Sequence, residues 1–169
     1  MRDIAERLGI KSGTIYHHFS SKEDLLFEIV HDVYVRSLAL LERVQAIEGT
    51  PVAKLEQLMH GHVENVTRDV VTTALALNEY KALRPAHARV IDEEHRIYVA
   101  GFLDLIREGQ KLRLVRPELD PELATLAVVG CLNSIVRWYR DPSVRPPEHV
   151  ADTFVEVLLA GVVGPDVSV

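Results

Sequence analysis

The sequence predicts an all-α protein, and three observations lead to that prediction. Apolar residues recur every three or four positions over most of the 169-residue chain, as they do along one face of a helix. Strand-like alternation of apolar and polar residues between turn signals is absent. Residues that cap or break helices are few and well spaced. The composition, 47% hydrophobic and 26% charged, is that of a globular protein with a sizeable core.

Caps and breakers divide the chain into successive helices. Gly9 ends a short first helix that begins at residue 2, and Ser12 caps a second that runs to about residue 18. Ser20 or Ser21 caps a long third helix. The pairs Thr50-Pro51 and Asp120-Pro121 each supply a cap followed by a proline at the first helical position. We therefore expect further helices over residues 21–48, 51–69, 70–83, 86–111, 123–139 and 147–163, of which 123–139 is apolar nearly all round.

Composition excludes several classes of protein. The single cysteine, Cys131, rules out an internal disulfide and a cysteine-based zinc site, and it fits a reducing compartment. No signal peptide is visible at the start of the chain. The longest stretch without a charge, fourteen residues between Glu122 and Arg137, is too short to span a bilayer. We expect a cytoplasmic protein with no membrane partner and no cofactor.

The first two short helices form a helix-turn-helix candidate. Ala5 is small enough for the second helix to cross the first closely, and Gly9 makes the turn. Residues 1–22 contain four bases and two acids, which gives this segment a formal charge of +2. The chain as a whole carries −6, so the remaining residues carry −8. A positive head on an acidic body suggests that the head meets polyanions. The alternative is a helical hairpin that caps a bundle. The outward residues of the second helix are Lys11, Ser12, Thr14, Tyr16, His17 and His18.

The segment "MRDIAERLGIKSGTIYHHFSSKEDLL" resembles the DNA-binding signature of the TetR family of one-component bacterial regulators. The resemblance implies an all-α homodimer that binds a palindromic operator in double-stranded DNA and responds to a small-molecule effector. It divides the chain into a head at residues 1–24, a connecting helix at 25–48, and a ligand-binding and dimerisation domain at 49–169. The residues that carry the resemblance are Ile4-Ala5, Gly9, Gly13-Thr14, Tyr16, His18-Phe19, Lys22-Glu23 and Leu25.

Family position implies roles for individual head residues. Lys11, Ser12 and Thr14 fall where base contacts are expected in the major groove. The phosphate contacts fall to Tyr16, His17, Lys22 and Arg2. The family's heads carry one more helix before the helix-turn-helix, and this chain begins at the helix-turn-helix itself. We expect that the start lies inside a longer natural frame or was trimmed, which would leave the head loose on DNA.

Dimerisation is expected in the last two helices, where the family places it. The helix over 123–139 has more apolar surface than one core-facing stripe requires. The alternative, left open by the sequence, is that the same side chains fill the core of one subunit. The expected interface residues are Val128, Leu132, Phe154, Leu158 and Val162.

A ligand cavity is expected among the middle helices, mostly apolar with a few polar groups. The segment "SIVRWYRDP" resembles part of the TetR-type regulators that sense acyl-CoA thioesters, with Arg137 and Arg140 placed for phosphates and Trp138 for the adenine. The alternative is that Trp138 packs under the proline-rich loop and the arginines pair with Glu148 or Asp152. The ligand candidates are Met59, His62, Tyr80, Tyr98, Phe102, Asn133, Arg137 and Trp138, and several of these are equally good core residues.

Metal and catalytic interpretations have weaker support. Glu28 with His31, and Asp92 with His95, lie one helical turn apart, but neither pair has an obvious third ligand. We expect no metal site and no enzyme. The expected function is a repressor that a small hydrophobic or acyl-CoA-type effector releases from DNA. The alternative is a helical ligand-binding dimer that does not bind DNA because its head is truncated.

Overall fold

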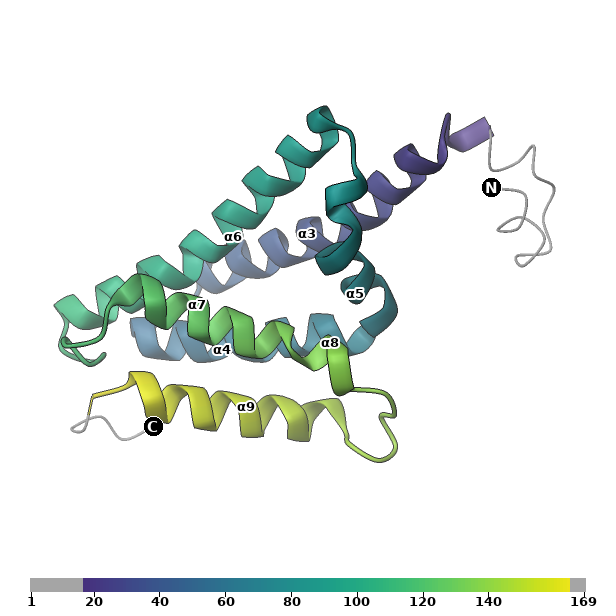
Figure 1. Cartoon of the computed structure of the whole chain (residues 1–169). Helices are drawn as coiled ribbons and strands as arrows, with labels where there is room; N and C mark the ends of the chain where they lie inside the picture. The colour runs from purple at the N-terminus through teal and green to yellow at the C-terminus, as the bar shows by residue number, and fades with distance from the viewer. Residues whose placement is uncertain (1–16, 165–169) are drawn as a thin grey trace.

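The computed structural model describes residues 17–164, which form helices joined by short connections (Figure 1). Residues 1–16 and 165–169 are not described. Between residues 17 and 164 no strand forms, and the sole β-type pairing is an isolated bridge between Val115 and Val163. The elements are α3 (Lys22–Ala46), α4 (Pro51–Arg68), α5 (Val70–Glu79), the 3-10 helix η1 (Tyr80–Ala82), α6 (Pro85–Lys111), α7 (Pro121–Asn133), α8 (Ile135–Trp138) and α9 (Pro147–Val162).

The predicted caps at Ser21, Thr50 and Asp120 are confirmed, whereas the helix end predicted at Gly9 and the cap predicted at Ser12 lie outside the described residues. The Ser21 hydroxyl accepts a hydrogen bond from the backbone N–H of Asp24 at 3.0 Å at the start of α3. Thr50 caps α4 in the same way and is followed by proline at the first helical position. Asp120 accepts from the backbone N–H groups of Glu122 and Leu123 and starts α7. Each cap satisfies a backbone donor that the first turn of a helix leaves free.

One predicted helix is wrong as a continuous element. Residues 123–139 split at Ser134 into α7 and α8. The backbone N–H of Ser134 is shared between the carbonyls of Gly130 and Cys131, both at 3.1 Å. The Ser134 hydroxyl also donates to the Cys131 carbonyl at 2.6 Å. A serine hydroxyl that competes for a helix carbonyl in this way locally distorts the helix. The helix predicted over 70–83 likewise tightens into η1 after Glu79.

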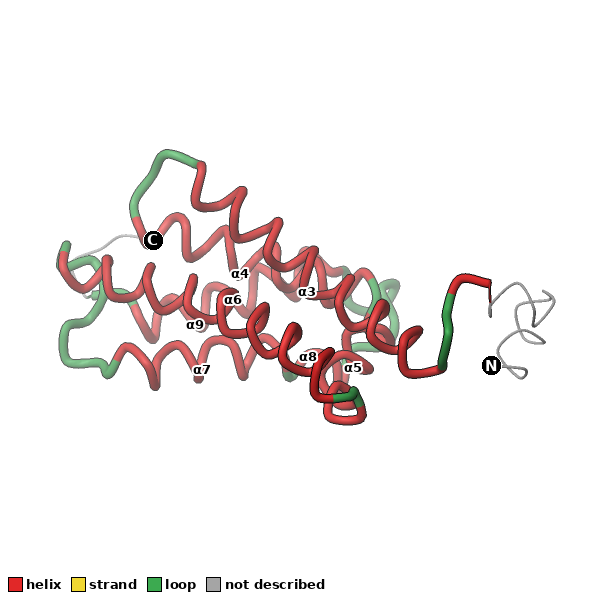
Figure 2. Tube along the Cα trace, turned by 90° about the horizontal axis from the view of Figure 1, so that it is seen from above, coloured by secondary structure: helices red, strands yellow, loops and turns green. Residues whose placement is uncertain are grey.

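The helices α4, α7 and α9 run side by side, while α3 and α6 diverge from them toward the other end of the molecule (Figure 1). The helix α3 packs against α4, α5 and α6. Seen from above, the start of α3 lies at the end of the molecule farthest from α7 and α9 (Figure 2). The helix α3 therefore extends away from α7 and α9 at its N-terminal end (Figure 1).

Two groups of buried side chains hold these helices together. The larger, here the main core, contains 26 buried residues contributed by all the long helices except α5. The smaller, here the small core, consists of Val30, Tyr34, Ala76, Leu83 and Ile91, and it joins the first half of α3 to α5 and α6. The two halves of α3 thus belong to different hydrophobic groups.

Two glycines let the second half of α3 approach its neighbours closely. A Cβ at Gly61 of α4 would lie 2.5 Å from Cδ1 of Leu40, and a Cβ at Gly101 of α6 would lie 2.4 Å from Cδ1 of Leu41. Both leucines are 4% exposed. The second half of α3 is therefore wedged between α4 and α6 with no room for another methyl group.

No helix among the described residues is both long and apolar enough to cross a bilayer.

Candidate functional site

A cavity lies between the main core and the small core. Tyr34 and Ala76 of the small core line one side, and Val66, Tyr98 and Val129 of the main core line the other. The cavity measures about 540 Å³ with its mouth included, and about 40 Å³ of it can take the centre of a water-sized atom. Its walls come from five helices, α3 to α7. The site is narrow and largely apolar.

Polar groups inside the cavity come mainly from three side chains. The His62 ring of α4 lies parallel to the Tyr98 ring of α6, and its Nδ1 is 3.0 Å from the Tyr98 hydroxyl oxygen. Asn133, at the end of α7, lines the same space. Nε2 of His62 is buried and has no hydrogen-bond partner among the described residues. An orphaned polar atom in a buried wall is costly, and it is one of the features that mark ligand sites.

Burial controls the protonation of these groups. Burial lowers the pKa of His62 to about 4. The Asn133 side chain lies close enough to favour the protonated ring, although it makes no well-formed hydrogen bond to Nε2, and it offsets the effect of burial on the pKa only in part. Burial likewise raises the pKa of the Tyr98 hydroxyl well above its usual range. Desolvation, helped by Tyr80 and two nearby carboxylates, raises the pKa of Tyr34 to about 12. The cavity is therefore electrically neutral at its inner wall near neutral pH.

The predicted ligand residues do not all meet at this cavity. His62, Tyr98 and Asn133 line it together. Met59 and Phe102 are fully buried in the main core, with Phe102 edge-on to His62 behind the wall. The structure places the other three elsewhere: Tyr80 packs against the small core, Arg137 is exposed, and Trp138 lies against α9.

The surroundings of Trp138 follow the alternative interpretation in part. Its ring stacks on Phe154 of α9 at 5.7 Å between centroids, and the Arg145 guanidinium of the proline-rich loop sits over it, also at 5.7 Å. Arg140 donates to backbone carbonyls at the end of α8, including that of Arg137. Neither Arg137 nor Arg140 forms an ion pair with a described carboxylate, so the pairing with Glu148 or Asp152, which belonged to the alternative interpretation, does not form.

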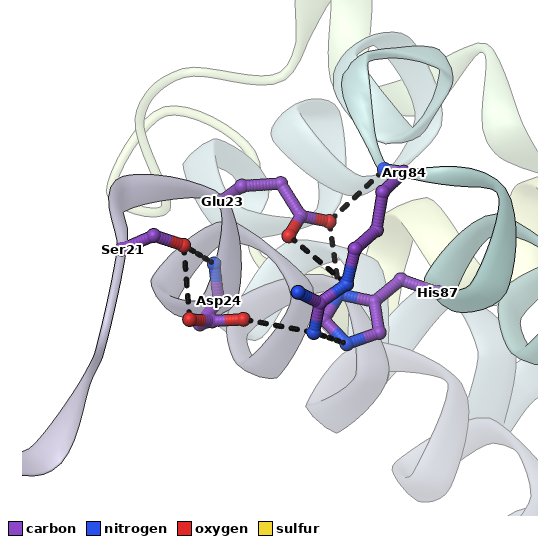
Figure 3. Close-up of polar contacts among 5 residues, drawn as sticks. All are labelled: Ser21, Glu23, Asp24, Arg84 and His87. Carbon is purple, nitrogen blue, oxygen red and sulfur yellow. Dashed lines mark hydrogen bonds and ion pairs between the residues drawn. The ribbon is translucent and has the colours of Figure 1, made fainter.

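A polar cluster fastens the start of α3 to the start of α6 (Figure 3). It consists of Glu23, Asp24, Arg84 and His87. One carboxylate oxygen of Glu23 accepts from the Arg84 backbone N–H at 3.0 Å and lies 2.8 Å from Nδ1 of His87. The Arg84 guanidinium lies 3.0 Å from Asp24 and 2.6 Å from Nε2 of His87. The cluster spans more than sixty residues of sequence and joins two helix ends.

The hydrogen bonds in the polar cluster are mutually consistent. Arginine can only donate, so Nε2 of His87 accepts from Arg84 and Nδ1 carries the proton given to Glu23. Phe27 stacks on the same imidazole with centroids 3.9 Å apart. Glu23, Asp24 and His87 bring potential metal-ligand atoms within 4.8 Å of one another. The Arg84 guanidinium neutralises one of the two carboxylate charges and occupies Nε2 of His87, so this group is best described as a structural contact.

Of the seven expected DNA contacts, His17 and Lys22 fall among the described residues. Both are exposed, and Lys22 is the first residue of α3. His17 lies edge-on to His18 with ring centroids 5.4 Å apart. Arg2, Lys11, Ser12, Thr14 and Tyr16 lie outside the described residues.

The expected interface residues divide into two groups. Val128, Leu132 and Val162 are at most 7% exposed within one subunit, so they fill the subunit core, the alternative that the sequence left open. Phe154 and Leu158 are half-buried. The outward faces of α7 and α9 instead present Leu123, Leu126 and Val157, each more than 60% exposed. A Cβ at Gly130 or Gly161 on these faces would meet nothing within 4 Å.

Sequence reasoning missed the polar cluster and the part of the cavity that α3 supplies. Glu23 was noted only as part of the family signature, and its partners lie 61 and 64 positions away. Val33, Tyr34 and Arg36 line the cavity because the first half of α3 faces it. Their helical spacing indicated a buried face, but nothing local distinguishes a cavity wall from an ordinary core contact.

Comparison with known proteins identifies the family to which this architecture belongs. Residues 1–29 match the family described as bacterial regulatory proteins, tetR family, and residues 48–162 match the tetracyclin repressor-like C-terminal domain. The HTH-type transcriptional repressor KstR2 of Mycolicibacterium smegmatis is 28% identical over 180 residues, covering 96% of this chain and 80% of the repressor.

Solved structures agree with the sequence matches. The ketosteroid transcriptional regulator KstR2 of Mycobacterium tuberculosis has the same fold, with a TM-score of 0.89 at 24% identity, over 96% of this chain and 84% of that one. AibR, solved with isovaleryl coenzyme A and operator DNA, superposes with a TM-score of 0.81 at 28% identity, over 94% of this chain and 85% of that one. With an N-terminal match to the DNA-binding module and a C-terminal match over most of the body, the chain belongs to the TetR family of bacterial transcriptional regulators.

Proposed function

We propose that this protein is a dimeric transcriptional repressor that an acyl-CoA-type effector releases from its operator. One observation carries the proposal. The N-terminal match to the DNA-binding module runs to residue 29 and therefore into α3, and the same helix forms a wall of the cavity through Val33, Tyr34 and Arg36. A ligand in the cavity and a duplex at the head thus act on the same helix, the ligand near its middle and the duplex at its start.

The coupling follows from how α3 is held. Its second half is wedged at Gly61 and Gly101, whereas its first half is held by the small core, by the polar cluster and by the His31–Glu94 contact at 2.8 Å. A ligand that enters between the two cores pushes the first half of α3 away from α4 and α6. In a dimer this shift changes the spacing of the two heads, which must match successive major grooves to bind an operator.

DNA contacts form the second part of the proposal. Lys11, Ser12 and Thr14 contact base edges, and Tyr16, His17, Lys22 and Arg2 contact phosphates. The exposed positions of His17 and Lys22, next to the capped start of α3, support this assignment. Residues 1–24 act as the head, 25–48 as the connecting helix and 49–169 as the ligand-binding and dimerisation domain.

An acyl-CoA effector is supported by the neighbour AibR, which was solved with isovaleryl coenzyme A. It is also supported by the cavity itself, which offers apolar walls for a hydrocarbon group and a few polar atoms for its head. Two cationic groups on the outer surface could bind the phosphates of CoA. They are the exposed side chain of Arg137 and the guanidinium of Arg145 above the Trp138 ring. The relatives are named repressors and regulators, which supports an action by binding in the cytoplasm and not by catalysis.

The dimer surface belongs to the same proposal. The outward faces of α7 and α9 meet their counterparts in a four-helix contact, with Leu126 and Val157 near its centre. Their exposure, above 60% each, and the open space over Gly130 and Gly161 support this placement. Leu126→Glu would bury an unpaired charge there, so sedimentation velocity should show monomers. Leu112→Glu, at an equally apolar exposed position after α6, is the matched control and should leave the dimer intact.

The central experiment measures binding of the full chain to DNA from upstream of its own gene by fluorescence anisotropy. We expect specific binding that isovaleryl-CoA or a longer acyl-CoA weakens at least tenfold, while free CoA does not. Lys22→Ala should weaken binding to all sequences and reduce the salt dependence by about two units of slope, one for each subunit of the dimer. Lys81→Ala, an exposed lysine on η1, is the matched control. Acyl-CoA binding without DNA binding would favour the alternative of a ligand-binding dimer.

A further inference from the structure

The most unusual atom in the cavity is Nε2 of His62. It is fully buried, it lacks a hydrogen-bond partner among the described residues, and it belongs to a side chain that lines the cavity. Two hydroxyl groups that line the same cavity are satisfied within their own helices. The hydroxyls of Ser37 and Thr73 donate to backbone carbonyls of their own helices, at 2.9 Å each. His62 is therefore the one described lining group that is both buried and unsatisfied.

The contact with Tyr98 determines which ring nitrogen carries the proton. If the Tyr98 hydroxyl donates to Nδ1, the proton of the neutral ring sits on Nε2. If Nδ1 carried the proton instead, the Tyr98 hydroxyl hydrogen would have no acceptor among the described residues, and Nε2 would still be unpaired. The first arrangement leaves one unsatisfied group and the second leaves two. The preferred tautomer therefore presents an N–H donor to the cavity.

We infer that the cavity binds its effector through a neutral carbonyl oxygen, which accepts a hydrogen bond from Nε2–H of His62 beside the Asn133 amide. The inference rests on the proposed function in one respect, that effectors enter this cavity. It adds the chemistry of the group that is recognised. A hydrocarbon chain alone would leave the N–H unpaired, whereas a thioester or ketone satisfies it without bringing a charge into an apolar site.

A carboxylate fits this position poorly. The inner wall holds no cation, because burial keeps His62 neutral near neutral pH. The other basic side chains that line the cavity, Arg36 and His95, stand at the mouth. Arg36 is already ion-paired with Asp32, one turn earlier on α3. An ionised fatty acid would thus lose its hydration without gaining a buried counter-charge, and the site should prefer the thioester or the ketone.

Two measurements on the full-length protein test the inference. Long-range proton–nitrogen NMR of the histidine side chains should show His62 as the Nε2–H tautomer at neutral pH. Addition of 2-octanone should move its Nε2 and Nε2–H signals, while octanoate at the same concentration should not. Observation of the Nδ1–H tautomer, or an equal response to both compounds, would overturn the inference. The ketone contains no CoA, so this test is independent of the proposed acyl-CoA effector.

Calorimetry then isolates the carbonyl within the CoA series. Isovaleryl-CoA and its thioether analogue, which has a methylene in place of the carbonyl, should differ about tenfold in affinity for the wild type. His62→Phe keeps a flat ring and should reduce that ratio to about one. His62→Gln keeps an N–H donor and should retain a ratio above one, so the result does not depend on a single variant. Equal binding of both ligands by the wild type would sink the inference. If neither CoA ligand binds but 2-octanone still shifts the His62 Nε2 signals, the acyl-CoA proposal fails and the inference stands.

Discussion

The two halves of α3 are held by different kinds of interaction. The second half contributes Leu40, Leu41 and Val44 to the main core and is wedged against two glycines. The first half contributes Val30 and Tyr34 to a core of five buried residues, and its start is fastened by charged side chains. Close packing resists displacement, whereas a small core and partly exposed ion pairs yield at lower free energy.

This difference indicates where movement is possible. The cavity lies at the boundary between the two cores, so a ligand there is opposed on one side by the main core and on the other by the small core. The weaker side gives way. A regulator needs such an asymmetry, because a helix that is equally fixed along its length transmits no change from ligand to head.

The largest expected effect comes from breaking the main core. Phe102→Ala, at a fully buried position, should lower the free energy of unfolding by about 3–5 kcal/mol. Val30→Ala, equally buried in the small core, should cost about 2 kcal/mol. Urea titration gives both values. Hydrogen exchange sharpens the contrast, since Val30→Ala should speed exchange only in the first half of α3, in α5 and at the start of α6. Faster exchange in α9 would contradict two separate cores.

Lowering the pH should destabilise the protein through His62, which lies at the boundary between the two cores. His62 has a pKa of about 4 when folded and about 6.5 when unfolded, so the unfolded chain binds the proton first as pH falls. Stability should be constant above about pH 6.5 and decrease by roughly 3 kcal/mol toward pH 4. Thermal unfolding across this range measures the loss. His62→Phe should remove that component, and an unchanged pH profile in the variant would show that another group is responsible.

Filling the space at Gly101 tests the wedge directly. Gly101→Ala forces the Leu41 side chain out of its position and should cost about 1–3 kcal/mol, despite the better helix propensity of alanine. A double-mutant cycle with Leu41→Ala provides the control. If the wedge is real, the two changes together should cost less than the sum of their separate effects by at least about 0.5 kcal/mol. Additivity would mean that the two residues do not compete for space.

The smallest effect on stability is expected at the polar cluster. The Glu23 side chain is 25% exposed, so Glu23→Gln should change the free energy of unfolding by less than about 1 kcal/mol. The same change should reduce the effector's influence on DNA affinity by a factor of about 2 to 5, because the start of α3 is no longer fixed to α6. Glu93→Gln, in an exposed pair with Arg96 on α6, is the matched control. If the effector changes DNA affinity by the same factor in both variants, the polar cluster plays no part in the coupling.

The predictions from sequence were accurate where structure depends on local chemistry. Caps at Ser21, Thr50 and Asp120 lie where the residue types place them, because a cap involves only the next three residues. The break at Ser134 was missed, since neither glycine nor proline marks it. Of the ligand candidates, His62, Tyr98 and Asn133 meet at one cavity and Arg137 does not. That outcome depends on how α4, α6 and α7 cross, which no local pattern encodes.

The end of α9 is tied back to the turn after α6. The backbone N–H of Gly164 donates to the Leu114 carbonyl at 3.0 Å, and that of Arg116 donates to the Val162 carbonyl at 3.0 Å. The chain from residue 114 to residue 164 therefore forms a ring closed by hydrogen bonds, with the exposed proline-rich loop at 141–146 on its far side. A protease nick in that loop would leave both fragments anchored. The loop is thus a natural position at which to split or circularly permute the protein.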